Sequence, residues 1–344
     1  MMERVVRLGL VGFGNVGQGL AQILMESHDE YLSKYGLDLK IIAVSDAQKG
    51  NLFNPDGLDA GMLLEKISQD GHLNGLVTEK THWNALTMIR ECNADVIVEM
   101  SYTDLQTGQP ATDYIIEALT QKKHVVTTNK GPVALHYTRL AALAAANGVQ
   151  IGVEGTVMSG TPTLRLAREI LDGARIKKVM GIFNGTTNYI LTQMENGMSY
   201  ADALADAQKL GYAEADPTGD VEGFDAAGKV VILARLLMKE QITMEDVDRT
   251  GISGLSVDDV NTAKAAGERW KLIGSLERVD ERLVASVKPQ RLPLSHPLAG
   301  VGGATNAAHF VTDYMGEVTL IGPGAGRLPT GYALIEDILA IYRN

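Results

Sequence analysis

Two charged residues, Asp225 and Lys229, stand four positions apart in a stretch that is otherwise mostly apolar or small. On a helix this spacing places both side chains on one face. A charged pair on a mostly buried helix costs desolvation energy unless it meets partners or a ligand. The pKa of a lysine moves readily on burial, so Lys229 is a candidate proton donor near neutral pH. The alternative is an ordinary surface ion pair, which contributes about 0.3–0.5 kcal/mol.

A turn rich in acidic residues precedes this pair. Glu214, Asp216 and Asp220 are suited to a pocket for a cationic group such as an amine. The alternative is local: an aspartate before proline favours a turn, and Asp220 suits a helix N-cap. Farther upstream, residues 183–188 end a predicted strand and begin a helix. They form either a plain cap or a set of backbone N–H groups for a substrate carboxylate.

A second constellation lies near the N-terminus, where a predicted strand runs into a glycine-rich turn that opens a helix. The turn is Gly12, Phe13, Gly14, Asn15, Val16 and Gly17, and it fits the pattern G-x-G-x-x-G. In this context the glycines permit a tight turn, and the helix N-terminus faces a pyrophosphate. The alternative is a structural glycine-rich β-turn.

Asp46 ends the next predicted strand, where an acidic side chain commonly binds the ribose hydroxyls and favours NAD. Lys49 stands three residues later and suits the 2′-phosphate of NADP, and Asp46 is equally suited to capping the next segment. The residues therefore leave the choice between NAD and NADP open. Lys130 follows another strand, at the sheet edge where ligands bind; its alternative is a solvated loop lysine.

Alternating strands and helices must position these groups over the first 150 residues or so. Strands are expected at Val5–Val11, Leu39–Val44, Asp95–Met100, His124–Thr128 and Gly148–Val153, and helices at Asn15–Tyr35, Ala111–Gln121 and Val133–Asn147. Continuous apolar strands that alternate with helices predict a parallel sheet covered on both faces.

The pattern changes in the second half of the chain. Strands are expected at Arg175–Phe183, Arg269–Glu277 and Leu283–Lys288, and the last two are expected to be antiparallel. Helices are expected from Thr186 to about Lys239, and a last helix at Thr330–Tyr342. The glycine-rich segments Gly300–Asn306 and Gly322–Gly326 are expected to be loops. The fold class is therefore α/β, a Rossmann-type parallel-sheet domain with a second α+β domain. With no flexible linker apparent, the site is expected in a cleft between the domains.

Composition excludes several classes of function. The net charge is −11 over 344 residues, which provides no basic surface for nucleic acid and disfavours an anionic membrane. Cys92 is the only cysteine, so neither an intrachain disulfide nor a cysteine-based zinc site is expected. The histidines form no metal-binding spacing, and the N-terminus lacks the apolar run of a signal peptide. We expect a cytoplasmic protein without a transition-metal site.

Several segments, taken in order over nearly the whole chain, resemble one family. They are Gly12–Gly17, Thr103-Asp104, Thr107–Pro110, Thr127–Gly131, Asn184–Tyr189, Gly322–Gly326 and the long stretch from Ala207 through Pro217 to Lys229. Together they resemble the homoserine dehydrogenases, and the stretch ending at Lys229 is the most specific. The resemblance is to a short form without a C-terminal regulatory domain or a fused aspartate kinase.

The resemblance implies reversible NAD(P)-dependent interconversion of L-aspartate 4-semialdehyde and L-homoserine, a step in threonine, methionine and isoleucine biosynthesis. It implies that Lys229 is the acid–base group, Asp225 its partner, and Lys130 a second catalytic or cofactor-contacting lysine. Substrate would be held by Glu214, Asp220 and the backbone of Gly185 and Thr186. Ser101 and Gly324 join the glycine turn, Asp46 and Lys130 as expected cofactor contacts.

The resemblance also implies a layout of residues 1–153 for the dinucleotide, 154–320 for substrate and dimerisation, and 321–344 returning to the first domain. A homodimer or higher homo-oligomer is expected. The family often binds a monovalent cation, Na⁺ or K⁺, through backbone carbonyls. In this chain these would be the carbonyls of Glu154, Val157, Ser159 and Thr161, although Met158 and Ser159 depart from the usual small or aliphatic residues.

The rival functions are a different NAD(P)-dependent amino-acid or sugar dehydrogenase and a non-catalytic dinucleotide sensor.

Overall fold

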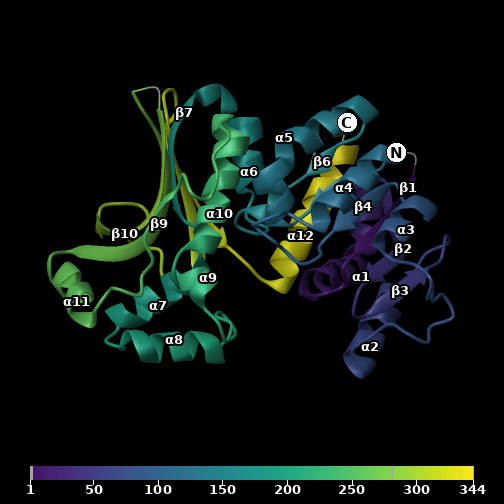
Figure 1. Cartoon of the computed structure of the whole chain (residues 1–344), viewed down its shortest axis with the longest axis horizontal. Coiled ribbons are helices and arrows are strands. Elements are labelled where there is room, and N and C mark those ends of the chain that lie inside the picture. Colours follow the sequence, from purple (N-terminus) through teal and green to yellow (C-terminus); the bar gives the residue numbers. More distant parts are fainter. Residues whose placement is uncertain (1–2, 281, 344) are drawn as a thin grey trace. The chain divides into compact units, whose positions relative to one another are not determined.

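The computed structural model describes residues 3–280 and 282–343. They form two compact units: Met1–Gly160 with Gly326–Asn344, and Thr161–Ala325 (Figure 1). The units divide a few residues beyond the boundaries expected at 153/154 and 320/321, so Gly324 lies in the second unit. None of the described helices combines the length and apolar character needed to cross a bilayer.

A six-stranded sheet forms the centre of the first unit, in the order β3-β2-β1-β4-β5-β6. The strands are β1 (Arg4–Val11), β2 (Leu37–Asp46), β3 (Gly50–Phe53), β4 (Val96–Glu99), β5 (His124–Thr127) and β6 (Ile151–Gly152). All neighbours pair in parallel except β3, which runs antiparallel to β2 at the edge. The predicted parallel sheet is therefore confirmed, with one antiparallel strand added. Its order reverses between β1 and β4, the point where open α/β sheets bind ligands.

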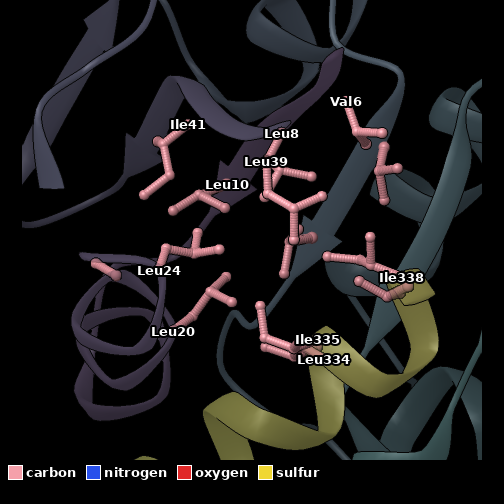
Figure 2. Close-up of a cluster of buried hydrophobic side chains, with 14 of the residues drawn as sticks. Val6, Leu8, Leu10, Leu20, Leu24, Leu39, Ile41, Leu334, Ile335 and Ile338 are labelled. Atoms are coloured by element: carbon pink, nitrogen blue, oxygen red, sulfur yellow. The ribbon is translucent and has the colours of Figure 1, made fainter. Parts of the chain in front are cut away.

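Helices cover both faces of this sheet, as the continuous apolar strands predict. They are α1 (Asn15–Tyr35), α2 (Ala60–Asp70), α3 (Ala85–Glu91), α4 (Ala111–Thr120), α5 (Lys130–Asn147) and α12 (Arg327–Tyr342). One hydrophobic core joins β1, α1 and α12, with Leu8, Leu20 and Ile338 among its members (Figure 2). A separate core on the other face includes Ile97, Ile115 and Leu140. The last helix therefore packs in the first unit, beside α1.

The second unit contains another six-stranded sheet, in the order β12-β11-β7-β9-β10-β8. Its strands are β7 (Ile176–Ile182), β8 (Asp248–Arg249), β9 (Glu268–Val279), β10 (Arg282–Pro293), β11 (Thr305–Thr312) and β12 (Gly316–Pro323). The pairings are antiparallel except for the short parallel pair of β8 and β10. Its main helices are α7 (Gly185–Glu195), α8 (Tyr200–Lys209), α9 (Thr218–Val221), α10 (Phe224–Leu233) and α11 (Val257–Ala265).

Two expected loops are wrong in part, because each runs into a strand. Thr305 and Asn306 begin β11, and Gly322 and Pro323 end β12. Glycine weakens a strand signal in sequence, but here β11 and β12 are held by pairing with each other and with β7. The close pairing of Asn306 with Gly322 brings the end of β12 against the start of β11.

Candidate functional site

The glycine turn joins β1 to α1 in the first unit. Gly12 has a φ of +91°, and a Cβ there would lie 2.7 Å from the carbonyl oxygen of Met100. A Cβ at Gly17 would lie 3.0 Å from the carbonyl oxygen of Gly12, whereas one at Gly14 would meet nothing within 4 Å. The turn is therefore tight on its inner side and open at Gly14, which lets a ligand approach the backbone closely.

The start of α1 carries N–H groups without a side-chain cap. Gly14 occupies the N-cap position with no side-chain hydrogen bond, and Asn15 and Val16 are the first helical residues. Phe13 is fully buried and packs in the hydrophobic core, and its N–H donates to Asp46, so this residue supports the turn from behind rather than contacting a ligand. Helix N–H groups of this kind, together with the helix dipole, favour a phosphate group.

A pocket of about 770 Å³ opens beside this turn. It is bordered by the ends of β1, β2 and β4, with Gly12, Gly14, Asp46, Ser101 and Trp83 among its lining residues. The size and position suit a nucleotide, and the uncapped turn suits its pyrophosphate. The residues present therefore fit a dinucleotide.

Asp46 faces the pocket while its carboxylate accepts backbone hydrogen bonds. Its Oδ2 accepts from the N–H of Phe13 at 2.7 Å, and its Oδ1 accepts from the N–H groups of Gln48 and Lys49 at 2.9 Å each. The ammonium of Lys49 lies 4.0 Å from Oδ2. Burial alone would raise the pKa of Asp46, but these donors and Lys49 together hold the pKa below its usual value. Asp46 therefore stabilises the turn as well as lining the pocket.

A buried glutamate that no local sequence pattern marks connects the loops after β4 and β5. Glu99 Oε1 accepts from the N–H of Ser101 at 2.8 Å and from its hydroxyl, and Oε2 accepts from the Thr127 hydroxyl at 2.8 Å. Asn129 donates to the Ser101 carbonyl at 3.2 Å and caps α5, which begins at the half-buried Lys130. Burial raises the pKa of Glu99. The network fixes the backbone from which Ser101 and Lys130 project.

The second unit brings Asp225 and Lys229 together on α10. The Lys229 ammonium lies 2.6 Å from Asp225 Oδ2 and donates to the Phe183 carbonyl oxygen at 2.5 Å. Lys229 is 7% exposed, and the following residues through Leu233 are buried. The predicted shared face and buried helix are confirmed, and the surface ion pair is wrong. The lysine is held at the end of β7, where the chain turns into α7.

Asn184 lies between the two aspartates of this site. Its Nδ2 donates to Asp220 Oδ1 at 2.7 Å and to Asp225 Oδ2 at 3.0 Å. Burial and the charge of Asp225 raise the pKa of Asp220, and the hydrogen bond from Asn184 lowers it by less, so the pKa stays above its usual value. Asp220 does not serve as a helix N-cap, because Gly223 occupies that position before α10 with a φ of +79°. From the sequence alone, Asn184 is expected only as part of a cap or of a carboxylate-binding turn.

The acidic turn is tied to α7 and α8 by backbone carbonyls. The Thr186 hydroxyl donates to the Tyr212 carbonyl oxygen at 2.7 Å, and Gln208 Nε2 donates to the Glu214 carbonyl oxygen at 3.0 Å. Glu214 itself is exposed. Asp216 is also exposed and accepts from the Thr218 N–H at 3.1 Å, as a local turn residue does. The anchors therefore fix the loop backbone and leave the Glu214 carboxylate at the surface.

Gly185 and Gly324 both pack against Asn306 in the second unit. A Cβ at Gly324 would lie 2.1 Å from Asn306 Nδ2, and one at Gly185 would lie 2.6 Å from the carbonyl oxygen of Ala304. Only glycine fits at either position. The start of α7 and the end of β12 are thereby held close to one buried side chain.

The expected cation ligands lie on a segment with unusual backbone geometry. Met158 and Ser159 have φ values of +60° and +54°, and Glu154 and Val157 are buried. The carbonyl of Thr161 accepts from the Thr163 N–H at 2.6 Å, and that of Glu154 from the Val157 N–H at 3.4 Å. Within residues 3–280 and 282–343 there is no group of three or more His, Cys, Asp or Glu suited to a metal. The cation stays a prediction.

Comparisons with known proteins agree with this geometry. A family model described as the NAD-binding domain of homoserine dehydrogenase matches residues 12–154, and the homoserine dehydrogenase model matches residues 162–339. An NAD(+)-dependent homoserine dehydrogenase of Pseudomonas canavaninivorans is 46% identical, covering 98% of this chain and 96% of the relative. A homoserine dehydrogenase of Methanocaldococcus jannaschii is 40% identical, covering 97% of this chain and 98% of the relative.

Solved structures extend the similarity to the fold. A crystal structure of a putative homoserine dehydrogenase from Archaeoglobus fulgidus has a TM-score of 0.88 at 37% identity, covering 98% of this chain and 99% of that chain. A hyperthermophilic archaeal homoserine dehydrogenase mutant in complex with NADPH has a TM-score of 0.84 at 31% identity, covering 98% of each chain. Fold and site thus define an NAD(P)-dependent oxidoreductase. The chain belongs to the homoserine dehydrogenase family and has that activity.

Proposed function

We propose that Lys229 transfers the proton in the interconversion of L-aspartate 4-semialdehyde and L-homoserine. The observation that carries this proposal is the buried ammonium held by Asp225 Oδ2 and the Phe183 carbonyl oxygen. An ammonium has three N–H donors, and the described residues provide these two acceptors. The remaining donor is available for the oxygen of the substrate.

Lys229 acts in both directions of the reaction. During reduction its ammonium donates a proton to the aldehyde oxygen as negative charge develops there, and during oxidation its neutral amine accepts the alcohol proton. Asp225 keeps the Nζ atom in place through their 2.6 Å contact. A donor placed in this way contributes about 10²- to 10⁴-fold to the rate.

The dinucleotide is held mainly by the first unit. The turn Gly12–Gly17 binds the pyrophosphate at the start of α1, and Ser101 and Lys130 are further contacts in this unit. Gly324, which belongs to the second unit, is also proposed as a contact. When bound, the nicotinamide supplies hydride to the aldehyde carbon or accepts it from the alcohol carbon. Lys130, at the first position of α5, is the second candidate for the proton donor.

NAD is the preferred dinucleotide in this proposal. The Asp46 carboxylate lines the pocket, and its lowered pKa keeps it anionic, which suits ribose hydroxyls and repels a 2′-phosphate. The Pseudomonas relative at 46% identity is named as NAD(+)-dependent, whereas the archaeal mutant was solved with NADPH. The ratio of kcat/KM for the two dinucleotides tests this preference.

The second unit binds the α-ammonium and α-carboxylate groups of the substrate. Asp220 and Glu214 bind the α-ammonium group, since both are acidic and Asp220 already lies beside the lysine pair through Asn184. The N–H groups of Gly185 and Thr186, at the start of α7, bind the α-carboxylate. This arrangement selects an amino acid over a sugar.

The quaternary structure and the cation belong to the same proposal. Val279, Val284 and Ile321 are about half exposed on β9, β10 and β12, which supports a homodimer or higher homo-oligomer built on this sheet. Light scattering that gives a monomer mass would contradict it.

The proposal also includes a cytoplasmic location and a monovalent cation. The cation would be bound by the carbonyls of Glu154, Val157, Ser159 and Thr161. Activity titrations with Na⁺ and K⁺ against a bulky organic cation test the cation.

A substrate panel tests the reaction itself. L-homoserine, L-serine, L-threonine and a sugar alcohol are each assayed for oxidation with NAD and with NADP at alkaline pH. Turnover specific to L-homoserine is expected. Faster turnover of another amino acid or of the sugar alcohol favours a different dehydrogenase, and binding of dinucleotide without any turnover favours a sensor.

A further inference from the structure

The side-chain amide of Asn184 makes hydrogen bonds in two opposite directions. On one side its Oδ1 accepts from the N–H of Thr187 at 2.9 Å and from the Thr187 hydroxyl at 3.0 Å, which caps α7. On the other side its Nδ2 donates to Asp220 at 2.7 Å and to Asp225 at 3.0 Å. The Thr187 N–H can only donate, so it fixes which end of the amide faces the carboxylates.

The charges around Asn184 explain why a neutral donor is needed. Asp225 and Lys229, both on α10, are the charged groups acting on Asp220, and the start of α7 contributes the neutral side chains of its N-cap Asn184 and of Thr186. A lysine or arginine at position 184 would place a positive charge beside the acid proposed to bind the substrate ammonium, and an acid there would repel both aspartates. An amide supplies N–H donors without changing the charge.

Because Asn184 is buried, water does not readily replace its hydrogen bonds to Asp220 and Asp225. Asn184 is 4% exposed, and Asp225 Oδ2 accepts from both Asn184 Nδ2 and Lys229 Nζ. Loss of the Asn184 donor removes one hydrogen bond from each of two partly buried carboxylates, and a lost hydrogen bond to a charged group costs more than one between neutral groups. Asn184 thus links the substrate-binding acid to the partner of the proton donor.

We propose that Asn184 is a positioning residue whose amide holds the carboxylates of Asp220 and Asp225 in place, so that one side chain orients both the substrate-binding acid and the partner of the proton donor. This inference rests on the proposed roles of Asp220 and Lys229. Asn184 acts through these residues and has no direct part in the chemistry.

The pH dependence of kcat/KM reports this role. Burial and Asp225 raise the pKa of Asp220, and the hydrogen bond from Asn184 lowers it. Since the substrate ammonium binds ionised Asp220, kcat/KM falls as the pH drops through that pKa. Loss of the Asn184 donor raises the pKa further, so the acid limb of the profile moves to higher pH.

Asn184→Ser and Asn184→Asp separate positioning from helix capping. Serine and aspartate are N-caps of about the same quality as asparagine, so both variants keep the cap of α7. Serine cannot span from the cap to both aspartates, and aspartate replaces the donor by a third carboxylate. Asp59→Ser at the N-cap of α2 is the matched control, because Asp59 accepts from the Met62 N–H at 2.7 Å and has no role in the site.

Steady-state rates with L-homoserine are measured from pH 6 to 10, together with thermal unfolding and NADH binding. We expect kcat/KM for homoserine to fall about tenfold or more in Asn184→Ser and further in Asn184→Asp, with the acid limb displaced upward by about one pH unit. NADH affinity and the kinetics of Asp59→Ser should stay within about twofold of the starting protein.

Two results would overturn the inference about Asn184. One is a profile and kcat/KM unchanged in both variants, which would make Asn184 a cap alone. The other is unfolding of both variants, because an exchange that conserves the cap should leave the fold intact. A starting protein that does not oxidise homoserine would instead contradict the proposed function, so the two failures are distinguishable.

Discussion

Replacement of Lys229 by methionine removes the proposed proton donor with little change in volume. Lys229 is buried along its length on α10, and the unbranched methionine side chain fills most of the same space. The ammonium contacts with Asp225 and with Phe183 are lost. The variant therefore tests the charge and the proton of Lys229 rather than the packing of the helix.

The expected loss follows from the role assigned to this ammonium. A positioned acid or base contributes about 10²- to 10⁴-fold, which corresponds to about 3–5 kcal/mol of transition-state stabilisation. Because the proton moves in the transition state, kcat should fall by this factor while the homoserine KM changes by less than about tenfold. Lys229→Arg should also lose activity, because arginine keeps the charge but does not deprotonate in this pH range.

The assay is the initial rate of dinucleotide reduction with L-homoserine, measured with thermal unfolding of each variant. Lys66→Met is the matched control, since it breaks an ion pair with Asp70 of the same sequence separation on the surface helix α2. A kcat in Lys229→Met within about threefold of the starting protein would refute the reasoning. Lys130 would then be the first candidate to examine by the same exchange.

Three further variants test the dinucleotide and substrate contacts. Gly12→Ala should raise the dinucleotide Kd at least tenfold in a fluorescence titration, because its φ is +91° and the new Cβ would lie 2.7 Å from the Met100 carbonyl oxygen; an unchanged Kd would show that the turn is not the binding site. Asp46→Ser should move the ratio of kcat/KM for NAD over NADP toward NADP by about tenfold, and a ratio that stays constant would remove Asp46 from dinucleotide selection. Glu214→Gln should raise the homoserine KM by about tenfold with kcat within about threefold, whereas the reverse pattern would place Glu214 in the chemistry rather than in binding.

Local signals in the sequence are sufficient to predict much of the first unit. The helix Asn15–Tyr35 has the predicted bounds because a glycine turn precedes it and Gly36, in the left-handed conformation, ends it. The spacing of Asp225 and Lys229 likewise required only the period of a helix. Both features depend on residues close together in the chain.

Features that depend on distant residues could not be predicted. The Asn184 amide reaches carboxylates 36 and 41 positions later, and Glu99 bonds to a hydroxyl 28 positions later, so no local pattern signals either network. Similarly, β11 begins in a glycine-rich segment and is defined by its partners β7 and β12. The N-cap role considered for Asp220 is wrong because Gly223 is the N-cap residue of α10.

The most direct test of the account is a paired kinetic measurement on purified protein. Initial rates of L-homoserine oxidation are recorded with NAD and with NADP for the starting protein and for Lys229→Met at equal concentration. We expect turnover of homoserine, faster with NAD, and a kcat at least 100-fold lower in Lys229→Met with dinucleotide binding retained. Equal rates in the two proteins, or no turnover of homoserine with either dinucleotide, would contradict it.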